Sequence, residues 1–131
     1  DLPTEPVSGQ SLLLVEDDTA VRSTLADLLS ATGHVVTVAA TAEQALELLE
    51  NTFQSVVLSD VDLGTGASGV ELMQRIAEHD PTLPRILMSG LPAEFLVSRF
   101  GLSEQQPLLA KPFTIQQLDA AIRQATALFQ S

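Results

Sequence analysis

Five short apolar runs alternate along the chain with five longer stretches of helical period, and this alternation constrains the fold more than any other feature. The apolar runs cover residues 11–15, 34–38, 55–59, 85–88 and 107–110. The helical stretches cover residues 19–31, 42–50, 69–79, 93–100 and 114–129. Because the runs are continuously apolar, we expect helices on both faces of a parallel sheet. The sequence therefore predicts an α/β domain, and right-handed crossovers favour a doubly wound sheet.

The helical predictions rest on the spacing of apolar residues. In the first stretch Val21, Leu25 and Leu29 share one stripe, while Arg22 faces elsewhere. Thr41 stands directly before the second stretch, where a hydroxyl can cap the first amides of a helix. The fourth stretch is the shortest, because a glycine interrupts it after residue 100.

Composition limits the class of protein and its surroundings. A chain of 131 residues suits one domain with its own core. Its formal net charge of −11 repels a polyanion, so direct binding of nucleic acid is not expected. The chain contains no cysteine, which fits a reducing, cytoplasmic compartment, and its apolar runs are too short to contact or span a membrane core.

Residues 1–10 contain two prolines and few apolar residues, which predicts a linker ahead of a domain over residues 11–131. The chain also lacks an initiator methionine. Together these features suggest a segment of a longer polypeptide.

Chemically active side chains follow four of the five predicted strands. They are Glu16, Asp17 and Asp18 after the first strand, Asp60 and Asp62 after the third, Ser89 after the fourth and Lys111 after the fifth. Ligands of open parallel sheets bind outside the carboxyl ends of the strands, so we expect these groups at one rim. Singly, each has a simpler explanation, such as an acidic residue favouring a helix N-terminus or a solvated lysine. Their joint placement points to a site.

Lys111 is the one lysine in the chain, beside five arginines. Its ammonium is a compact point charge that suits a carboxylate or phosphoryl oxygen. Clustered carboxylates repel one another unless a cation neutralises them, and their hard oxygen atoms suit Mg²⁺. The pattern predicts phosphoryl transfer onto Asp60, with Ser89 and Lys111 binding the remaining phosphoryl oxygens.

These motifs resemble those of response-regulator receiver domains from two-component systems. The acidic opening after residues 12–15, Asp60 after residues 56–59, Ser89 before a glycine and Lys111 before Pro112 and Phe113 all match, and the resemblance covers the chain from about residue 11 to the last helix. It implies a flavodoxin-like fold, a five-stranded parallel sheet of order 2-1-3-4-5 with five helices. The isolated domain would catalyse only its own phosphorylation and dephosphorylation.

The resemblance also implies residue roles and partners. Glu16 and Asp17 would be metal-site acids, Asp60 both nucleophile and metal ligand, and Asp62 a ligand through its backbone carbonyl. Ser89 would be the switch hydroxyl and Lys111 its ion-pair partner, while Asp18 would cap the first helix. The implied partner is a kinase or phosphotransfer domain that carries phosphohistidine, and the domain itself would be a monomer or weak dimer.

Three departures from the family pattern matter. Gly64 stands where the family usually has proline, in a loop that is one residue longer than in single-domain receivers. Leu108 replaces the usual switch aromatic, and the fourth helix is short. The long loop, the short helix and the ending around Lys111 are similar to receivers attached to hybrid sensor histidine kinases. We therefore expect a receiver module of such a kinase.

Other functions remain open at this point. Asp60 and Asp62 resemble the aspartate pair of haloacid-dehalogenase-like phosphatases, although that pair normally follows the first strand. A receiver-like binding module that works without phosphorylation is a further alternative, which Leu108 keeps open. A calcium loop is rejected, because Thr65 stands where that loop needs glycine and a strand precedes it. His34, on the opposite rim from the site, and the second histidine, at residue 79, are expected to be structural.

Overall fold

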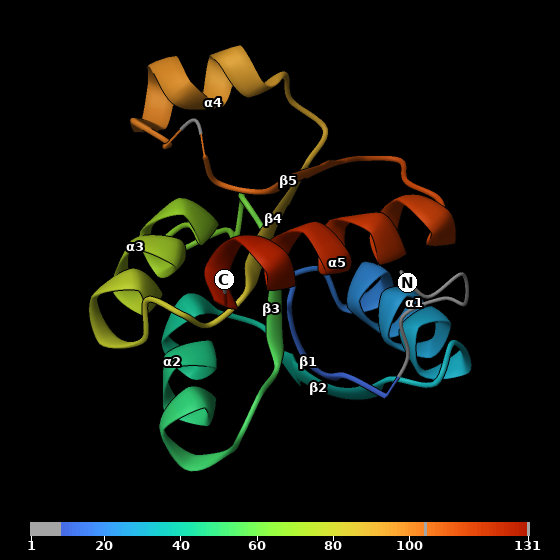
Figure 1. Ribbon diagram of the computed structural model, residues 1–131. Coiled ribbons are helices and arrows are strands. Elements are labelled where there is room, and N and C mark those ends of the chain that lie inside the picture. Colours follow the sequence, from blue (N-terminus) through green and yellow to red (C-terminus); the bar gives the residue numbers. More distant parts are fainter. Residues whose placement is uncertain (1–8, 104, 131) are drawn as a thin grey trace.

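The protein folds as a five-stranded parallel sheet with helices on both faces (Figure 1). The computed structural model describes residues 9–103 and 105–130, so most of the predicted linker lies outside the described residues. The strands are β1 (Ser11–Val15), β2 (Val35–Ala39), β3 (Val56–Asp60), β4 (Arg85–Ser89) and β5 (Leu108–Ala110). The helices are α1 (Thr19–Ala31), α2 (Ala42–Asn51), α3 (Gly69–His79), α4 (Ala93–Phe100) and α5 (Ile115–Gln130).

The strand order is β2-β1-β3-β4-β5 with every pair parallel, which confirms the predicted topology. The predicted strand bounds need corrections of one residue. β2 and β3 each lie one residue further along the chain, because Ala39 pairs with Val15 and Asp60 pairs with Met88. His34 lies outside β2, since its amide donates to the Leu29 carbonyl at the end of α1.

Side-chain caps fix where several helices begin. The carboxylate of Asp18 accepts the Val21 amide at 3.0 Å to start α1, and the hydroxyl of Thr41 accepts the Gln44 amide at 3.0 Å to start α2, as the sequence predicts. Ser68 caps α3 in a reciprocal capping box. Each cap satisfies an amide that would otherwise lack a partner within the helix.

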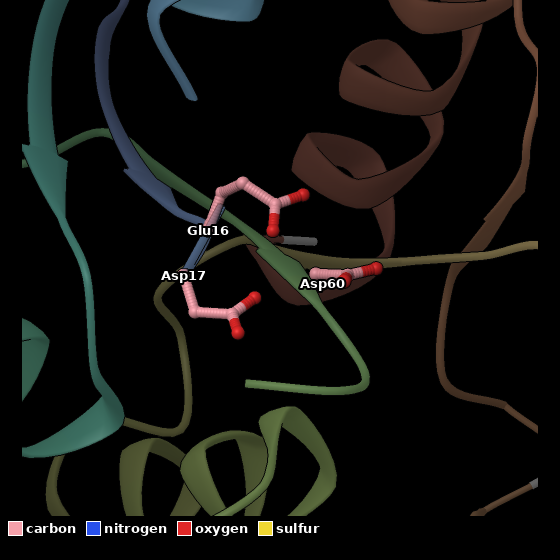
Figure 2. A group of neighbouring side chains, drawn as sticks. All are labelled: Glu16, Asp17 and Asp60. Atoms are coloured by element: carbon pink, nitrogen blue, oxygen red, sulfur yellow. The ribbon is translucent and has the colours of Figure 1, made fainter. Parts of the chain in front are cut away.

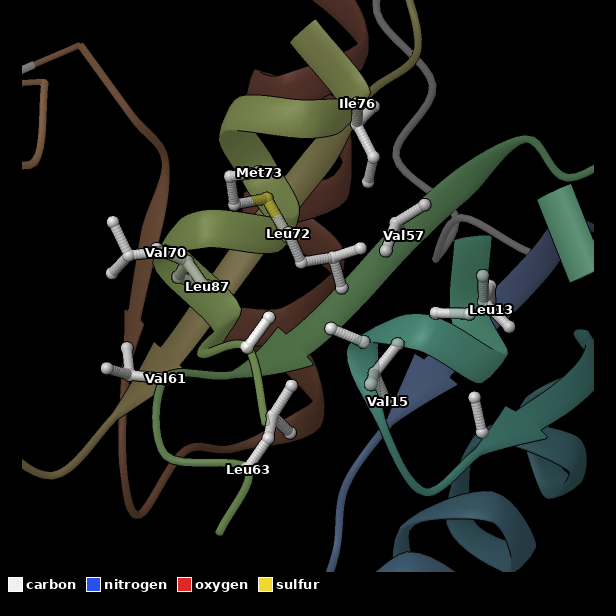
Figure 3. Packing of buried hydrophobic residues seen from close by; sticks show 14 of the residues in the cluster. Leu13, Val15, Val57, Val61, Leu63, Val70, Leu72, Met73, Ile76 and Leu87 are labelled. Carbon is white, nitrogen blue, oxygen red and sulfur yellow. The ribbon is translucent and has the colours of Figure 1, made fainter. Parts of the chain in front are cut away.

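Alternate residues of the central strands pack on opposite faces of the sheet. Leu13, Val15 and Val57 lie in a cluster with residues of α2 and α3, which Figure 3 shows from close by. Leu12 and Leu14 pack with residues of α1 and α5. Burying one such side chain contributes about 1.5–3 kcal/mol to folding. None of the helices in the described part of the chain has the length and apolarity that crossing a bilayer requires.

Candidate functional site

Three carboxylates gather where β1 and β3 end (Figure 2). Glu16 and Asp17 follow β1, and Asp60 is the last residue of β3. One carboxylate oxygen from each lies within 4.8 Å of the other two. Glu16 is buried with 2% of its surface exposed, Asp60 is half-buried and Asp17 is exposed. The predicted acidic cluster is therefore present, and the exposure of its carboxylates increases from Glu16 through Asp60 to Asp17.

Backbone hydrogen bonds beyond the strand ends position these groups. The Glu16 amide donates to the Ala39 carbonyl at 3.0 Å, and the Lys111 amide donates to the Ser89 carbonyl at 2.9 Å. The chain just beyond β3 is held in the same way by β4. Because parallel strands end at the same edge, the side chains of the first residues after each strand meet there.

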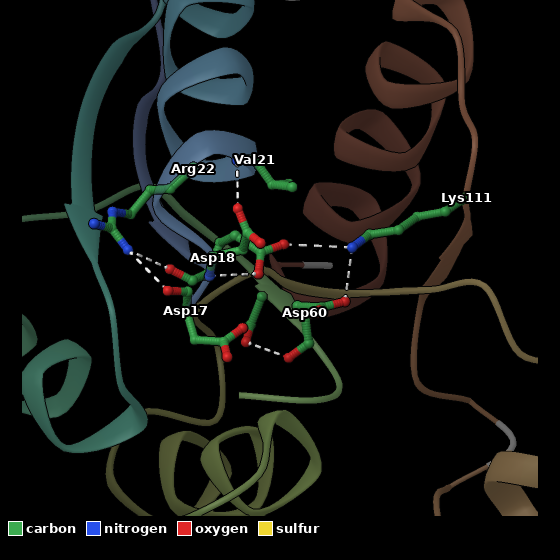
Figure 4. Close-up of polar contacts among 8 residues, drawn as sticks. Asp17, Asp18, Val21, Arg22, Asp60 and Lys111 are labelled. Atoms are coloured by element: carbon green, nitrogen blue, oxygen red, sulfur yellow. Dashed lines mark hydrogen bonds and ion pairs between the residues drawn. The ribbon is translucent and has the colours of Figure 1, made fainter. Parts of the chain in front are cut away.

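Lys111 bridges two of the carboxylates (Figure 4). Its Nζ lies 2.9 Å from Asp60 Oδ1 and 3.4 Å from Glu16 Oε1. Burial alone would lower the pKa of the ammonium, but the hydrogen bond to Asp60 and the charges of both carboxylates outweigh burial and raise the pKa. Lys111 is therefore charged at neutral pH and offsets part of the repulsion in the cluster.

Glu16 is the most buried of the three acids. Burial raises the pKa of its carboxyl. A hydrogen bond from the Asp18 amide to Oε2, at 3.3 Å, opposes this shift, whereas the charge of Asp60 adds to it. Lys111 again stabilises the ionised form. A divalent cation at this position would favour all three carboxylates in their ionised state.

Ser89 lies in the same pocket as Asp60 and Lys111. The pocket has a volume of about 530 Å³, and its wall also includes Phe100 from the end of α4. Ser89 is buried at the end of β4, and its Oγ accepts the Leu91 amide at 2.9 Å. The structure thus places the predicted hydroxyl and ammonium in the same pocket as the Asp60 carboxylate.

Asp62 does not join the carboxylate cluster with its side chain. It is exposed, and its Oδ1 accepts the Gly64 amide at 3.0 Å in a turn of the loop that joins β3 to α3. Its carboxylate is therefore engaged within its own loop. The expected role of its backbone carbonyl as a metal ligand stays a prediction.

The glycine in place of the family's proline has a conformational reason. Gly64 has φ +74°, which proline cannot adopt because its ring fixes φ near −65°. A Cβ at this position would lie 2.9 Å from Asp17 Oδ2. The loop therefore packs its backbone directly against one of the metal-site acids.

Sequence reasoning missed the role of Arg22. Its Nη1 donates to the Glu16 carbonyl at 2.9 Å and to the Asp17 carbonyl at 3.4 Å, so it holds the backbone of the acidic pair. The signal in the sequence was a cation within the first turns of the helix that follows the pair. The contribution of Phe100 to the pocket wall was also missed, because nothing in its helical spacing indicates it.

The donor set fits a small divalent cation. Mg²⁺ prefers hard oxygen ligands and is usually held by one or two carboxylates together with water and phosphoryl oxygens. The carboxylates of Glu16, Asp17 and Asp60 supply such oxygens at mutual distances that a single ion can bridge. Lys111 Nζ lies 2.9 Å from Asp60 Oδ1 and adds a positive charge beside this set.

Comparisons with known proteins agree with this geometry. Residues 12–123 match the response regulator receiver domain family. The chain is 31% identical over 121 residues to the C4-dicarboxylate transport transcriptional regulatory protein DctD of Rhizobium meliloti, covering 90% of this chain and 25% of that protein. It is 28% identical over 123 residues to the sensor kinase CckA of Brucella abortus, covering 92% of this chain and 13% of that protein.

Solved structures show the same fold. A response regulator receiver protein from Sinorhizobium medicae superposes with a TM-score of 0.77 at 25% identity, covering 91% of this chain and 95% of that one. By contrast, the chain spans a quarter or less of the two curated relatives described above. The sequence match, the shared topology and the acidic pocket at the rim together show that the chain belongs to the response regulator receiver domain family.

Proposed function

We propose that this receiver domain accepts a phosphoryl group on Asp60 from a phosphohistidine of a kinase or phosphotransfer domain. One observation carries the proposal: the Asp60 carboxylate ends β3 beside two further carboxylates, with Lys111 Nζ 2.9 Å from its Oδ1. A carboxylate so placed is an available nucleophile with a cation ready for the transferred group.

The reaction moves the phosphoryl group whole. An oxygen of the Asp60 carboxylate attacks phosphorus, the bond from phosphorus to the histidine nitrogen breaks, and the electron pair of that bond stays on the imidazole. The product is an acyl phosphate. Lys111 orients the carboxylate before transfer and pairs with the phosphoryl oxygens afterwards. Ser89 can turn its hydroxyl from the Leu91 amide to donate to a phosphoryl oxygen.

A bound Mg²⁺ would neutralise negative charge on the phosphoryl oxygens as transfer proceeds. Glu16, Asp17 and Asp60 would hold it, together with the backbone carbonyl of Asp62. Arg22 supports this set by fixing the carbonyls of the first two.

Intact mass spectrometry after incubation with Mg²⁺ and a small acyl phosphate tests the proposal. We expect one labile phosphoryl adduct on the unaltered protein, none on Asp60→Asn, and a normal adduct on Asp27→Asn, which changes an exposed aspartate on α1. An adduct that survives Asp60→Asn would refute the assignment. Repeated turnover of a simple phosphate ester would instead support the phosphatase alternative.

We further propose that the domain is a module of a hybrid sensor histidine kinase. The long loop after Asp60, the short α4 and the similarity to the sensor kinase CckA support this context, while the similarity to DctD supports a transcriptional regulator. The native polypeptide should carry a histidine kinase domain. A DNA-binding module attached to this receiver would contradict the hybrid origin and leave the phosphoacceptor chemistry standing.

A further inference from the structure

The loop between β3 and α3, residues 61–68, lies between two carboxylates from other elements. At one end Gly64 packs against Asp17, as described above. At the other end the Ala67 amide donates to Glu43 Oε2 at 3.3 Å, across 24 residues of sequence. A Cβ on Gly66 would lie 3.2 Å from Glu43 Oε1. Glu43 belongs to the first turn of α2 and is not one of the acids that form the metal pocket.

The loop has other contacts as well: its first residue, Val61, donates its amide to the Met88 carbonyl of β4, and the rest are local or reach the core. Leu63 and Ala67 are buried, with 3% and 7% of their surfaces exposed. The Asp62 turn and the Ser68 cap are local hydrogen bonds. The hydrogen bond to Glu43 is different, because it ties the loop laterally to α2.

We propose that Glu43 is a positioning residue for the metal site, an inference that rests on the proposed function. By accepting the Ala67 amide it holds the loop where Gly64 lies against Asp17 and where the Asp62 backbone reaches the rim. Groups that orient metal ligands without touching the ion contribute measurably to metal affinity. If the loop is released from α2, the Asp17 carboxylate becomes more mobile. Binding the ion then costs more conformational entropy, and the affinity falls.

Glu43 could alternatively act only through its charge, or only on the stability of α2. Its side chain is exposed, so its long-range charge is largely screened. An acidic residue in the first turn also favours the helix dipole. Two variants separate these effects: Glu43→Asp keeps the charge in the first turn but is too short to hold the Ala67 amide, while Glu43→Gln keeps the acceptor oxygen and removes the charge.

The measurement is the Mg²⁺ dissociation constant of the chain without any phosphoryl donor, followed by amide chemical shifts, together with hydrogen exchange at the Ala67 amide. We expect Glu43→Asp to bind Mg²⁺ on the order of tenfold more weakly and to exchange the Ala67 amide faster. Glu43→Gln should stay within about threefold of the unaltered protein. Glu47→Asp, an exposed glutamate one turn further along α2, is the matched control and should change neither quantity.

These outcomes distinguish failure of the Glu43 proposal from failure of the proposed function. Equal Mg²⁺ affinity for Glu43→Asp and Glu47→Asp overturns the role of Glu43 alone. Weakening by Glu43→Gln but not by Glu43→Asp shows a pure charge effect, which also overturns it. An unaltered protein that binds no Mg²⁺ overturns the metal part of the proposed function and this inference with it. Thermal denaturation of each variant shows whether folding is intact.

Discussion

Gly64→Ala tests whether the loop backbone packs against the Asp17 carboxylate as closely as the structure shows. The substitution has two separable consequences. The residue has φ +74°, and an L-residue in the left-handed region costs roughly 1–2 kcal/mol. The added Cβ would also lie 2.9 Å from Asp17 Oδ2. That oxygen ends a flexible, exposed side chain, so the carboxylate is expected to turn away instead of forcing the backbone apart.

The unfavourable φ therefore lowers the free energy of unfolding, whereas the contact between the new Cβ and Asp17 Oδ2 weakens metal binding. A loss of about 1 kcal/mol lowers the midpoint of thermal unfolding by roughly 3–5 °C for a domain of this size. Displacing one of three carboxylates should weaken Mg²⁺ binding on the order of tenfold. The assay is thermal unfolding with and without Mg²⁺, combined with a Mg²⁺ titration of the folded protein.

Gly101→Ala provides the control, because Gly101 has φ +67° and open space around its missing Cβ. It should show the backbone cost and keep normal Mg²⁺ affinity. The reasoning is refuted if Gly64→Ala and Gly101→Ala lose similar stability and bind Mg²⁺ equally well.

Three further predictions concern other parts of the molecule. Gly69→Ala should destabilise the fold by about 2–3 kcal/mol in chemical denaturation, because its Cβ would overlap the Asp60 carbonyl oxygen, whereas Gly90→Ala, with open space, should stay within about 0.5 kcal/mol. Burial lowers the pKa of His34, so on acidification the unfolded chain binds a proton at this residue before the folded protein does. The free energy of unfolding should therefore be at its full value above about pH 6.5 and fall as the pH drops below it. His34→Gln should flatten this dependence between pH 7.5 and 5.5, and an unchanged slope would contradict the account. Lys111→Ala should still bind Mg²⁺ but lose the amide chemical-shift changes that spread to α4 and β5 on phosphorylation of Asp60, and an unaltered spread would argue against a switch through the lysine.

The fold was predictable because its signals are local. Period and composition place all ten elements to within one residue at each end, the cap at Thr41 is readable from residue type, and the cap at Asp18 was implied by the family resemblance. The one-residue shift of β2 was not readable, because the His34 amide donates to the Leu29 carbonyl in a turn at the end of α1, which the apolar pattern does not indicate. Parallel topology then brings the strand ends together, so Asp60 and Lys111 could be placed at one rim before the structure was known.

The supporting contacts were not predictable in the same way. Arg22 binds the backbone carbonyls of Glu16 and Asp17, and Glu43 binds the backbone amide of Ala67, each through a long side chain. Loops have no periodic pattern, and which carbonyl or amide they present depends on a few dihedral angles. The positive φ of Gly64 is one such angle. The sequence showed that proline is absent there, but the Asp17 carboxylate next to Gly64 is visible only in the folded structure.

The two ion pairs of Lys111 join residues that lie 51 and 95 positions apart in the chain. During synthesis the carboxylates of Glu16 and Asp60 emerge from the ribosome long before the ammonium that balances them. A partly synthesised chain, or one cut before β5, therefore contains both carboxylates without the ammonium that pairs with them. The balance of charge in the acidic cluster is in this sense a late property of the molecule, acquired only when the last strand of the sheet has docked.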